Sequence, residues 1–383
     1  MENFNFKINY DECITNVACS ILKYFNCKYY HKTIEILDNI LSKKNPKNVV
    51  LILFDGLGSK LIDKILDKDS FLLKNRIKEI TSVFPSTTAA STLSVQTGLN
   101  PSEHGWLGWS NYISPIDTII QLFWDSEKGK NPKKEKNKEF IKIKNKYLTP
   151  KRLVDIIKEK DCDTYSISPY DEYKYNTLEE MFQLIKEKIE IKTDKKKFIY
   201  VYNKEPDSTM HIKGCDSEEA KQKILERNNK MEEFFNKNMD KDTLIIIVAD
   251  HGLINADYIK LENYPDIKEL MEKNIYIENR CPMFKIKEGK YKLFKELFEK
   301  NFGEYFYLLS KEDIINKKIF GDVKYKENEL FNSSLGDFIA INKNSNNLCF
   351  LDIDDTPLIS VHGGNSDDEV YIPLIILNKN NYK

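Results

Sequence analysis

Short, uninterrupted runs of apolar residues that end abruptly at polar side chains constrain the fold of this chain more than any other feature. The clearest runs are residues 48–54, 198–203 and 244–248. Apolar runs of this length, without polar alternation, are typical of strands that are buried on both faces. Apolar residues at helical spacing follow the first run over 61–66, so the sequence predicts repeated units of strand, loop and helix.

Further segments fit the same alternation. Residues 80–84 are predicted to form a strand, 85–88 a turn and 89–95 the start of a helix, and 337–341 and 370–377 are later strand candidates. Parallel strands need crossover helices, and their C-terminal ends meet at one edge of the sheet, where open α/β sheets bind ligands. We therefore expect an α/β fold with a mostly parallel central sheet flanked by helices.

Two stretches interrupt this alternation. Residues 128–146 are rich in Lys and contain Pro and Gly, which favours an exposed loop over a contact with a polyanionic substrate. Residues 253–329 mix helical and strand patterns, and we interpret them as an inserted smaller cap. The main domain would then comprise residues 1–252 and 330–383.

The charge balance and the termini exclude several partners. Lys and Arg together number 59 against 60 for Asp and Glu, so the chain has no net field that attracts nucleic acid or an anionic membrane. The first ten residues lack the pattern of a secretory signal, and no apolar stretch reaches the roughly 18 residues of a membrane-spanning helix. Seven scattered cysteines, with no CxxC pattern, indicate reduced thiols. We expect a cytoplasmic protein without a stable nucleic-acid partner.

Histidines are concentrated where metal ligands would be expected. Of the five in the chain, His211, His251 and His362 lie close to acidic residues or glycines in the loops of the predicted units. Imidazole nitrogens and carboxylate oxygens are the ligands of catalytic zinc, which keeps one position open for water or substrate. The three histidines are therefore candidates for a metal centre.

Each pair, taken alone, also has a simpler interpretation. Asp207 and His211 lie four residues apart, so they share a face if the segment is helical, but a surface hydrogen bond explains that pair equally well. Asp250 and His251 are adjacent, so they can converge on one ion only if the chain turns, as Gly252 permits.

Two threonines lie at the predicted N-terminus of a helix, where unpaired N–H groups favour an anion. For the hydroxyls around Thr87 and Thr88, helix capping by Ser86 or Thr87 is the simpler interpretation. An alcohol is a poor nucleophile at neutral pH unless a base or a metal lowers its pKa. Esterase and phosphate-loop alternatives are excluded because the chain has neither a GxSxG elbow nor GxxxxGK[ST] or GxGxxG spacing.

The motifs gain specificity from their order along the chain. They are Asp55, FPSTT at 84–88, TGLNPSEHG at 97–105, DSTMH at 207–211, DHG at 250–252 and HGG at 362–364. Over about residues 48–377, this set resembles the alkaline phosphatase superfamily, and most closely its nucleotide pyrophosphatase/phosphodiesterase branch. The resemblance implies an alkaline phosphatase-like catalytic core with two bound divalent metal ions, with zinc as the first choice and Mn²⁺ as the alternative.

The resemblance also implies a role for each site residue. One metal would be held by Asp207, His211 and His362. The second would be held by Asp55, Asp250 and His251. Thr88, with Thr87 as its rival, would attack phosphorus and form a phosphothreonine that water then hydrolyses. Ser91 stands where the branch commonly has an Asn that holds a phosphoryl oxygen, so we treat it as a candidate substrate contact.

A small phosphodiester or a nucleotide is the favoured substrate, because a diester carries one fewer ionisable oxygen than a monoester and no Arg lies near the nucleophile motif. A phosphate-monoester or phosphonate hydrolase on the same scaffold is the nearest alternative. An inactive metal- or nucleotide-binding protein is the alternative of another class. Trp106, Trp109, Tyr112 and Phe123 can stack a base, although aromatic residues more often fill a core.

Overall fold

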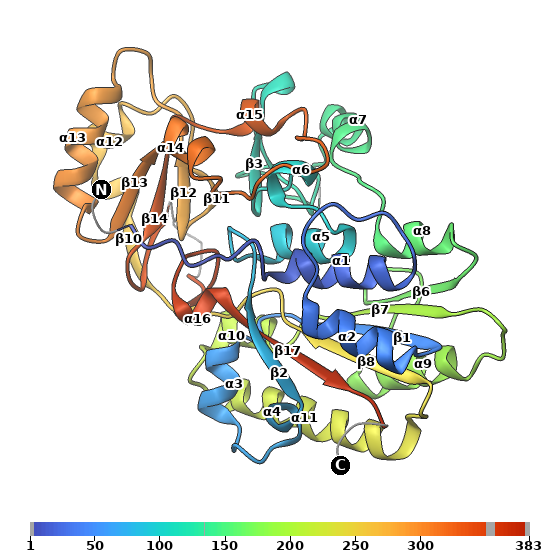
Figure 1. Cartoon of the computed structure of the whole chain (residues 1–383). Helices are drawn as coiled ribbons and strands as arrows, with labels where there is room; N and C mark the ends of the chain where they lie inside the picture. The colour runs from blue at the N-terminus through green and yellow to red at the C-terminus, as the bar shows by residue number, and fades with distance from the viewer. Residues whose placement is uncertain (1–3, 134, 350–356, 380–383) are drawn as a thin grey trace.

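The computed structural model of the chain describes residues 4–133, 135–349 and 357–379. Its two large sheets lie in separate halves of the molecule, and a layer of helices lies between them (Figure 1). Two small pairs of strands complete the β-structure of the described residues. They are β9 (Ile254–Asn255) with β16 (Ser360–Val361), and β10 (Asp257–Lys260) with β15 (Asn346–Cys349).

The first sheet has six strands in the order β2, β17, β8, β1, β7, β6. Their bounds are β1 Asn48–Phe54, β2 Arg76–Thr81, β6 Asp163–Ile167, β7 Lys197–Asn203, β8 Thr243–Val248 and β17 Tyr371–Leu377. Strands β8, β1, β7 and β6 pair in parallel, whereas β17 is antiparallel to both β8 and β2. The expected α/β class is confirmed, but the sheet is mixed rather than mostly parallel.

The direction of β17 follows from the path of the chain. The chain reaches the C-terminal edge of the parallel strands at His362, forms the short helix α16 (Asp367–Val370), and enters β17 directly at Tyr371. A strand that starts at this edge has to run against its parallel neighbours, because no crossover helix carries the chain back to the opposite edge. The apolar run at 370–377 predicts the strand but gives no information about its direction.

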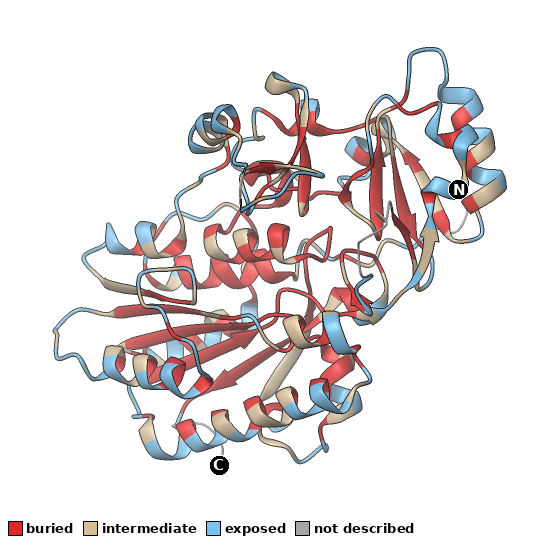
Figure 2. Cartoon of the chain, turned by 180° about the vertical axis from the view of Figure 1, so that it is seen from behind, coloured by how far each residue is buried: buried red, intermediate tan, exposed pale blue. Residues whose placement is uncertain are grey.

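The apolar runs form the buried centre of the first sheet. Every residue of β1 and β8 is buried, as Figure 2 shows for the strands of this half of the molecule. These runs match the two predicted segments at 48–54 and 244–248. The predicted strand at 80–84 is shifted, because β2 ends at Thr81 and the following residues, 82–87, form a buried loop.

Helices cover both faces of the first sheet. Helices α1, α5 and α8 pack together on the face toward the second sheet, and α3, α4 and α11 pack together on the opposite face (Figure 1). The helices of this half are α1 Ile14–Tyr24, α2 Glu35–Lys44, α3 Ser59–Ile65, α4 Phe71–Lys74, α5 Thr88–Thr97, α6 Pro101–His104, α8 Leu153–Lys158, α9 Leu178–Glu190, α10 Asp207–Lys213 and α11 Glu218–Asn238.

The second sheet has seven strands and is antiparallel throughout. In sheet order the strands are β13 Phe306–Ser310, β14 Phe338–Asn342, β12 Cys281–Phe284, β11 Tyr276–Glu278, β3 Ser110–Ile113, β4 Thr118–Gln121 and β5 Ser126–Glu127. The helices of this half are α7 Lys138–Tyr147, α12 Pro265–Lys268, α13 Tyr291–Phe302, α14 Lys311–Asn316 and α15 Phe331–Ser334.

This sheet combines three separate parts of the sequence. Strands β11, β12 and β13 come from the stretch 253–329, but they pair with β3 and β14, which lie outside it. The strand predicted at 337–341 is therefore present as β14, in the second sheet instead of the first. The boundaries of a separate cap at 253–329 stay a prediction.

The Lys-rich stretch 128–146 is more ordered than the predicted exposed loop. Lys128 is partly buried and donates a hydrogen bond from Nζ to the carbonyl of Ile275 at 2.8 Å. Helix α7 begins at Lys138, and its Phe140 is fully buried. Apolar residues at helical spacing among the lysines allow one face of α7 to pack while the charged face meets water.

Among the residues that the structure describes, no helix is both long and apolar enough to cross a membrane. The cytoplasmic location stays a prediction.

Candidate active site

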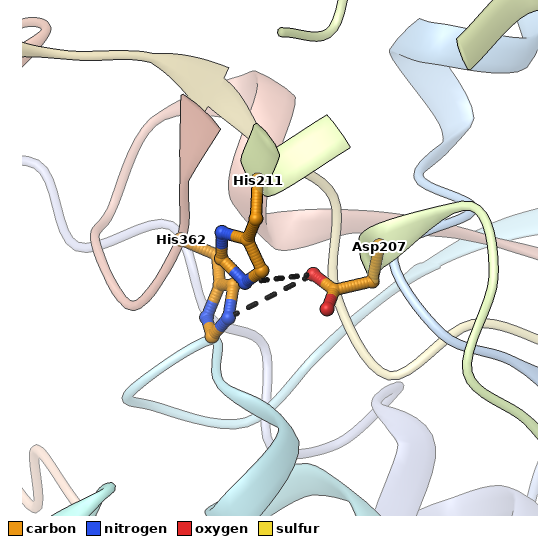
Figure 3. Close-up of side chains that lie close together, drawn as sticks. All are labelled: Asp207, His211 and His362. Carbon is orange, nitrogen blue, oxygen red and sulfur yellow. Dashed lines mark ion pairs between the residues drawn. The ribbon is translucent and has the colours of Figure 1, made fainter. Parts of the chain in front are cut away.

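One group of candidate ligands combines Asp207, His211 and His362 (Figure 3). Helix α10 begins at Asp207, so His211 follows one turn later on the same face, and its Nε2 lies 3.2 Å from Asp207 Oδ1. His362, in the loop after β16, brings its Nε2 within 3.9 Å of the same oxygen. The ring of His211 is oriented by a 2.7 Å contact between Nδ1 and the carbonyl of Ser360, which leaves Nε2 directed toward Asp207.

The second group combines Asp55, Asp250 and His251, all of them buried. Asp55 follows β1, and the other two follow β8, the neighbouring parallel strand, so the strand ends bring them together. His251 Nε2 lies 3.4 Å from Asp55 Oδ1 and 3.5 Å from Asp250 Oδ2. In each group, one ligand atom from every residue lies within 4.8 Å of the others.

The two groups are neighbours. The backbone N–H of Asp207 donates to the carbonyl of Asp55 at 3.1 Å, which joins the start of α10 to the end of β1. The rings of His251 and His362 stack with their centroids 3.8 Å apart. The six residues that the sequence analysis named as metal ligands therefore lie side by side in two sets of three.

Two glycines permit this close packing. Gly56 has a φ of +74°, and a Cβ there would lie 2.9 Å from the Cβ of Asp207. Gly252 was expected to allow a turn, but its role is one of space, because a Cβ there would lie only 1.9 Å from the carbonyl oxygen of Asp368. Any larger residue at Gly252 would push apart the loops that carry the ligands.

Burial disfavours the charged forms of the carboxylates and imidazoles in the two groups. It raises the pKa of Asp55 well above the ordinary value, and the charges of Asp250 and Asp207 add to that rise. Burial also raises the pKa of Asp207, and it lowers the pKa of His362 well below the ordinary value, with the charges of the other two histidines acting in the same direction. Buried carboxylates beside neutral imidazoles form a site that favours a cation.

The hydrogen bonding of the site fits divalent metal ions. Asp207 Oδ1 and Asp250 Oδ2 are buried and accept no hydrogen bond within the described part of the chain. The other oxygen of Asp250 accepts from the backbone N–H groups of Gly56 and His251, at 3.1 and 3.0 Å. Buried acceptors are rarely left without a partner, and the donor set of three carboxylates and three imidazoles matches the preference of Zn²⁺.

The hydroxyls of Thr87 and Thr88 have different surroundings. Thr88, the first residue of α5, is partly exposed, and its Oγ1 lies 3.0 Å from His251 Nε2 and 3.5 Å from Asp55 Oδ1. Thr87 is fully buried and donates its hydroxyl to Glu278 at 2.6 Å. Neither hydroxyl caps the helix, so the capping interpretation is wrong, and Thr88 is the one that lies at the candidate ligands.

Ser91 is connected to these groups through Ser82, whose hydroxyl donates to the carbonyl of Asp250. Its side chain is fully buried, and its hydroxyl forms a 2.7 Å hydrogen bond with the hydroxyl of Ser82. Position 91 lies one turn into α5 on a face that packs against the core, so its hydroxyl does not border the cavity and the expected substrate contact is not supported.

A cavity of about 1010 Å³ opens beside Thr88 and the candidate ligands. The structure divides the aromatic residues that the sequence analysis named. Tyr112 is buried away from the cavity, whereas Trp106, Trp109 and Phe123 line it together with Trp124, Trp106 being largely buried. The ring of Trp109 contacts those of Phe123 and Trp124 at centroid distances of 5.5 and 5.3 Å, so the three rings form one continuous wall.

The cavity also contains residues that the sequence gave no reason to select. Arg152 lines it, although no Arg lies near the nucleophile motif in sequence, and its guanidinium is paired with Asp171 at 3.2 Å. Glu278 and Asn279 line it as well. These two belong to the stretch 253–329, in which the sequence pattern contains no recognisable site residue. They reach the cavity through the pairing of the second sheet.

A buried ion pair supports the loops that carry the ligands. Arg280 donates from Nε and Nη2 to the two carboxylate oxygens of Glu369, at 2.9 and 2.6 Å, and both side chains are fully buried. The Glu369 carboxylate also accepts from the N–H of Gly364, and the Glu369 carbonyl accepts from the N–H of Gly252, both at 2.8 Å. The DHG and HGG loops therefore share one anchor.

Comparisons with known proteins identify the family and the fold of the chain. Residues 49–364 match the sequence profile of a family described as type I phosphodiesterase / nucleotide pyrophosphatase. No curated protein gives a significant sequence match. Murine ectonucleotide pyrophosphatase/phosphodiesterase 5 is similar in structure, with a TM-score of 0.61 and 19% identity over 85% of this chain and 87% of that one.

Two related structures give similar values. An inactive variant of the murine protein, in complex with AMP, has a TM-score of 0.60 and 19% identity over 85% of this chain and 87% of that one. The human counterpart has a TM-score of 0.61 and 17% identity over 86% and 88% of the two chains. At these identities the likeness establishes a shared fold.

Proposed function

Because the chain belongs to the type I phosphodiesterase / nucleotide pyrophosphatase family, a branch of the alkaline phosphatase superfamily, we propose that it hydrolyses phosphodiester or nucleotide pyrophosphate bonds through a phosphothreonine at Thr88. The observation that carries the proposal is the position of the Thr88 hydroxyl. It lies beside Asp55 and His251, and it faces the cavity that both ligand groups border.

The proposal assigns two metal ions to the two ligand groups. Asp207, His211 and His362 would hold one ion. Asp55, Asp250 and His251 would hold the other. Bound there, a pair of divalent ions, with zinc as the first choice, supplies Lewis acidity that lowers the pKa of a hydroxyl and neutralises charge on the attacking and leaving oxygens.

The residues of the chain position the reacting groups. Thr88 Oγ1 loses its proton and forms a bond to phosphorus while the bond to the leaving oxygen breaks. Water then attacks the same phosphorus, and Thr88 regains a proton as the product leaves. The first N–H groups of α5, at Ala89 beside the cavity, favour the negative charge of the phosphoryl group.

The cavity supports an organic group on the substrate phosphate. Trp109, Phe123 and Trp124 offer a wall of aromatic faces within the same cavity as Thr88. Planar bases stack favourably on such faces. A related murine protein has been solved with AMP, which supports a nucleotide as the substrate class for this chain.

Hydrolysis of bis-p-nitrophenyl phosphate by the purified protein tests the proposed function directly. We expect turnover in the parent protein and a covalent phosphoryl adduct on the peptide that contains Thr88, found by mass spectrometry after acid quenching. Thr88→Ala should show neither. A parent protein that cleaves p-nitrophenyl phosphate far better than the diester would favour the monoester alternative, and activity that survives Thr88→Ala would reject the nucleophile.

A further inference from the structure

Glu278 extends from the second sheet into the candidate active site. It is the last residue of β11, and its Oε1 accepts two hydrogen bonds, from Thr87 Oγ1 at 2.6 Å and from the backbone N–H of Trp109 at 2.8 Å. Thr87 directly precedes the proposed nucleophile. One carboxylate oxygen is therefore fixed against the turn from which Thr88 projects.

The rest of the carboxylate faces the cavity. Glu278 lines the same cavity as Thr88. Its Oε2 forms no hydrogen bond with a described residue, and it is not among the fully buried oxygens that lack a partner. Gly363 lies close to the Glu278 side chain, since a Cβ at that position would lie 2.9 Å from Glu278 Cγ. The loop that carries His362 thus packs directly against it.

The negative charge of Glu278 is not cancelled by an ion pair with a described residue. Lys128 attracts it, but the Lys128 ammonium donates its hydrogen bond to the carbonyl of Ile275. Arg280, two residues along the chain, is held by both oxygens of Glu369. An ionised Glu278 therefore adds negative potential at the phosphoryl end of the cavity.

Such a charge separates substrates by their own charge. A phosphate monoester dianion carries one more negative charge than a diester, so it is repelled more strongly by a fixed carboxylate. Coulomb interactions are stronger in a partly buried cavity than in bulk water, and like charges brought close together there reduce binding.

We propose that Glu278 is a specificity-determining residue that disfavours phosphate monoesters relative to diesters at this site. The inference rests on the proposed function, since it assumes that Thr88 receives the phosphoryl group. It adds a reason for the diester preference that lies in the cavity itself, beyond the absence of an Arg beside the nucleophile.

Glu278→Gln separates charge from positioning. Glutamine keeps a carbonyl oxygen that can accept from Thr87 and Trp109, but it removes the negative charge. Thr87→Val does the opposite, because it removes one of these hydrogen bonds and leaves the charge in place. Glu272→Gln is the matched control, since Glu272 is an exposed carboxylate of the same stretch that pairs with Lys285 outside the cavity.

The measurement is the ratio of kcat/KM for p-nitrophenyl phosphate to that for bis-p-nitrophenyl phosphate. The assay is run at about pH 9, because burial raises the pKa of Glu278 to about 7 and the carboxylate has to be ionised. In Glu278→Gln we expect the ratio to rise about tenfold or more, and inorganic phosphate to inhibit about tenfold more strongly. Thr87→Val and Glu272→Gln should keep the parent ratio, although Thr87→Val lowers both rates.

The outcomes distinguish this inference from the proposed function. A parent protein that cleaves neither ester rejects the proposed function. A parent protein that cleaves the diester, together with a Glu278→Gln variant whose ratio and phosphate inhibition are unchanged, rejects the inference alone. If Glu278→Gln does not fold, as judged by thermal unfolding, Glu278→Met provides a neutral side chain of similar volume for the same two measurements.

Discussion

Arg280 and Glu369 form a fully buried, two-pronged ion pair between the second sheet and the helix that precedes β17. Removing one partner of such a pair leaves an uncompensated buried charge. We expect Arg280→Met to reduce the free energy of unfolding by about 3–5 kcal/mol, measured by urea denaturation. The double variant Arg280→Met with Glu369→Leu should lose less than the sum of the single variants. Lys64 forms an exposed ion pair with Asp216 and provides the comparison. An equal loss of unfolding free energy in Lys64→Met would contradict this explanation.

Thr88→Ala should lower kcat for the diester by about 10³-fold or more, because it removes the proposed nucleophile beside His251 and Asp55. The other hydroxyl at Asp55, that of Tyr202, is already used as a donor to Asp55 Oδ2 at 2.5 Å. The matched control is Ser91→Ala, since Ser91 lies on the same helix with its hydroxyl bonded to Ser82. It should keep kcat within about threefold of the parent value. Steady-state kinetics of both variants decide the assignment, and a Ser91→Ala variant as inactive as Thr88→Ala would contradict it.

Metal removal should cost both activity and stability. Elemental analysis is expected to find about two zinc ions per chain, one for each three-residue ligand group. Dialysis against a chelator should abolish turnover and lower the melting temperature, because ions that bind only the folded state stabilise it and the remaining carboxylates repel one another. Added Zn²⁺ should restore both. Full activity in metal-free protein would reject the two-metal proposal.

Trp124→Ala tests whether the aromatic wall binds the organic part of the substrate. Stacking of one base on an aromatic side chain contributes about 1–3 kcal/mol, so KM for a dinucleotide should rise by about 5- to 150-fold. Turnover of methyl p-nitrophenyl phosphate, which has no base, serves as the reference. Tyr291→Ala is the matched control, because Tyr291 on α13 is as exposed as Trp124, at 42%, and does not line the cavity. The same KM for the dinucleotide in Trp124→Ala and the parent would exclude stacking at this wall.

His104 should make stability depend on pH below neutrality. Burial lowers its pKa to about 3 from the ordinary value of 6.5, so between these values the unfolded state binds one more proton than the folded state. Stability therefore falls as pH falls through this window, by about 1.4 kcal/mol per pH unit from this residue.

The comparison with His104→Gln isolates that contribution, because both proteins share every other titrating group. In chemical denaturation between about pH 6 and pH 4, the free energy of unfolding should fall less steeply in the variant than in the parent. Equal slopes would show that His104 is not held neutral in the folded state.

The parts of the site that depend on strand ends could be predicted from the sequence. Asp55 and the Asp250–His251 pair each follow a buried strand, and parallel strands bring their C-terminal ends to one edge of the sheet. The structure adds that these two strands are neighbours. Thr87 and Thr88 could not be separated in this way, because adjacent residues share the same local pattern. Only the contact with Glu278 shows that the Thr87 hydroxyl points away from the ligand groups.

Features that depend on tertiary packing could not be predicted from the sequence. Glu278 lies in a stretch without a recognisable motif, and it reaches the cavity only because β11 pairs with β3. Ser91 was chosen by its spacing from the nucleophile, but the orientation of α5 turns it into the core. The direction of β17 likewise depends on where the chain enters the sheet, which an apolar run does not specify.

The place of β17 in its sheet has a consequence for how the chain is made. Among the described strands of this sheet, β2 pairs with β17 alone, and β17 follows the other five strands in the sequence. During synthesis, the edge of β8 therefore remains unpaired until β17 has been made, and an unpaired edge favours aggregation. Deleting β17 should therefore separate β2 from the sheet and expose the edge of β8 at the same time.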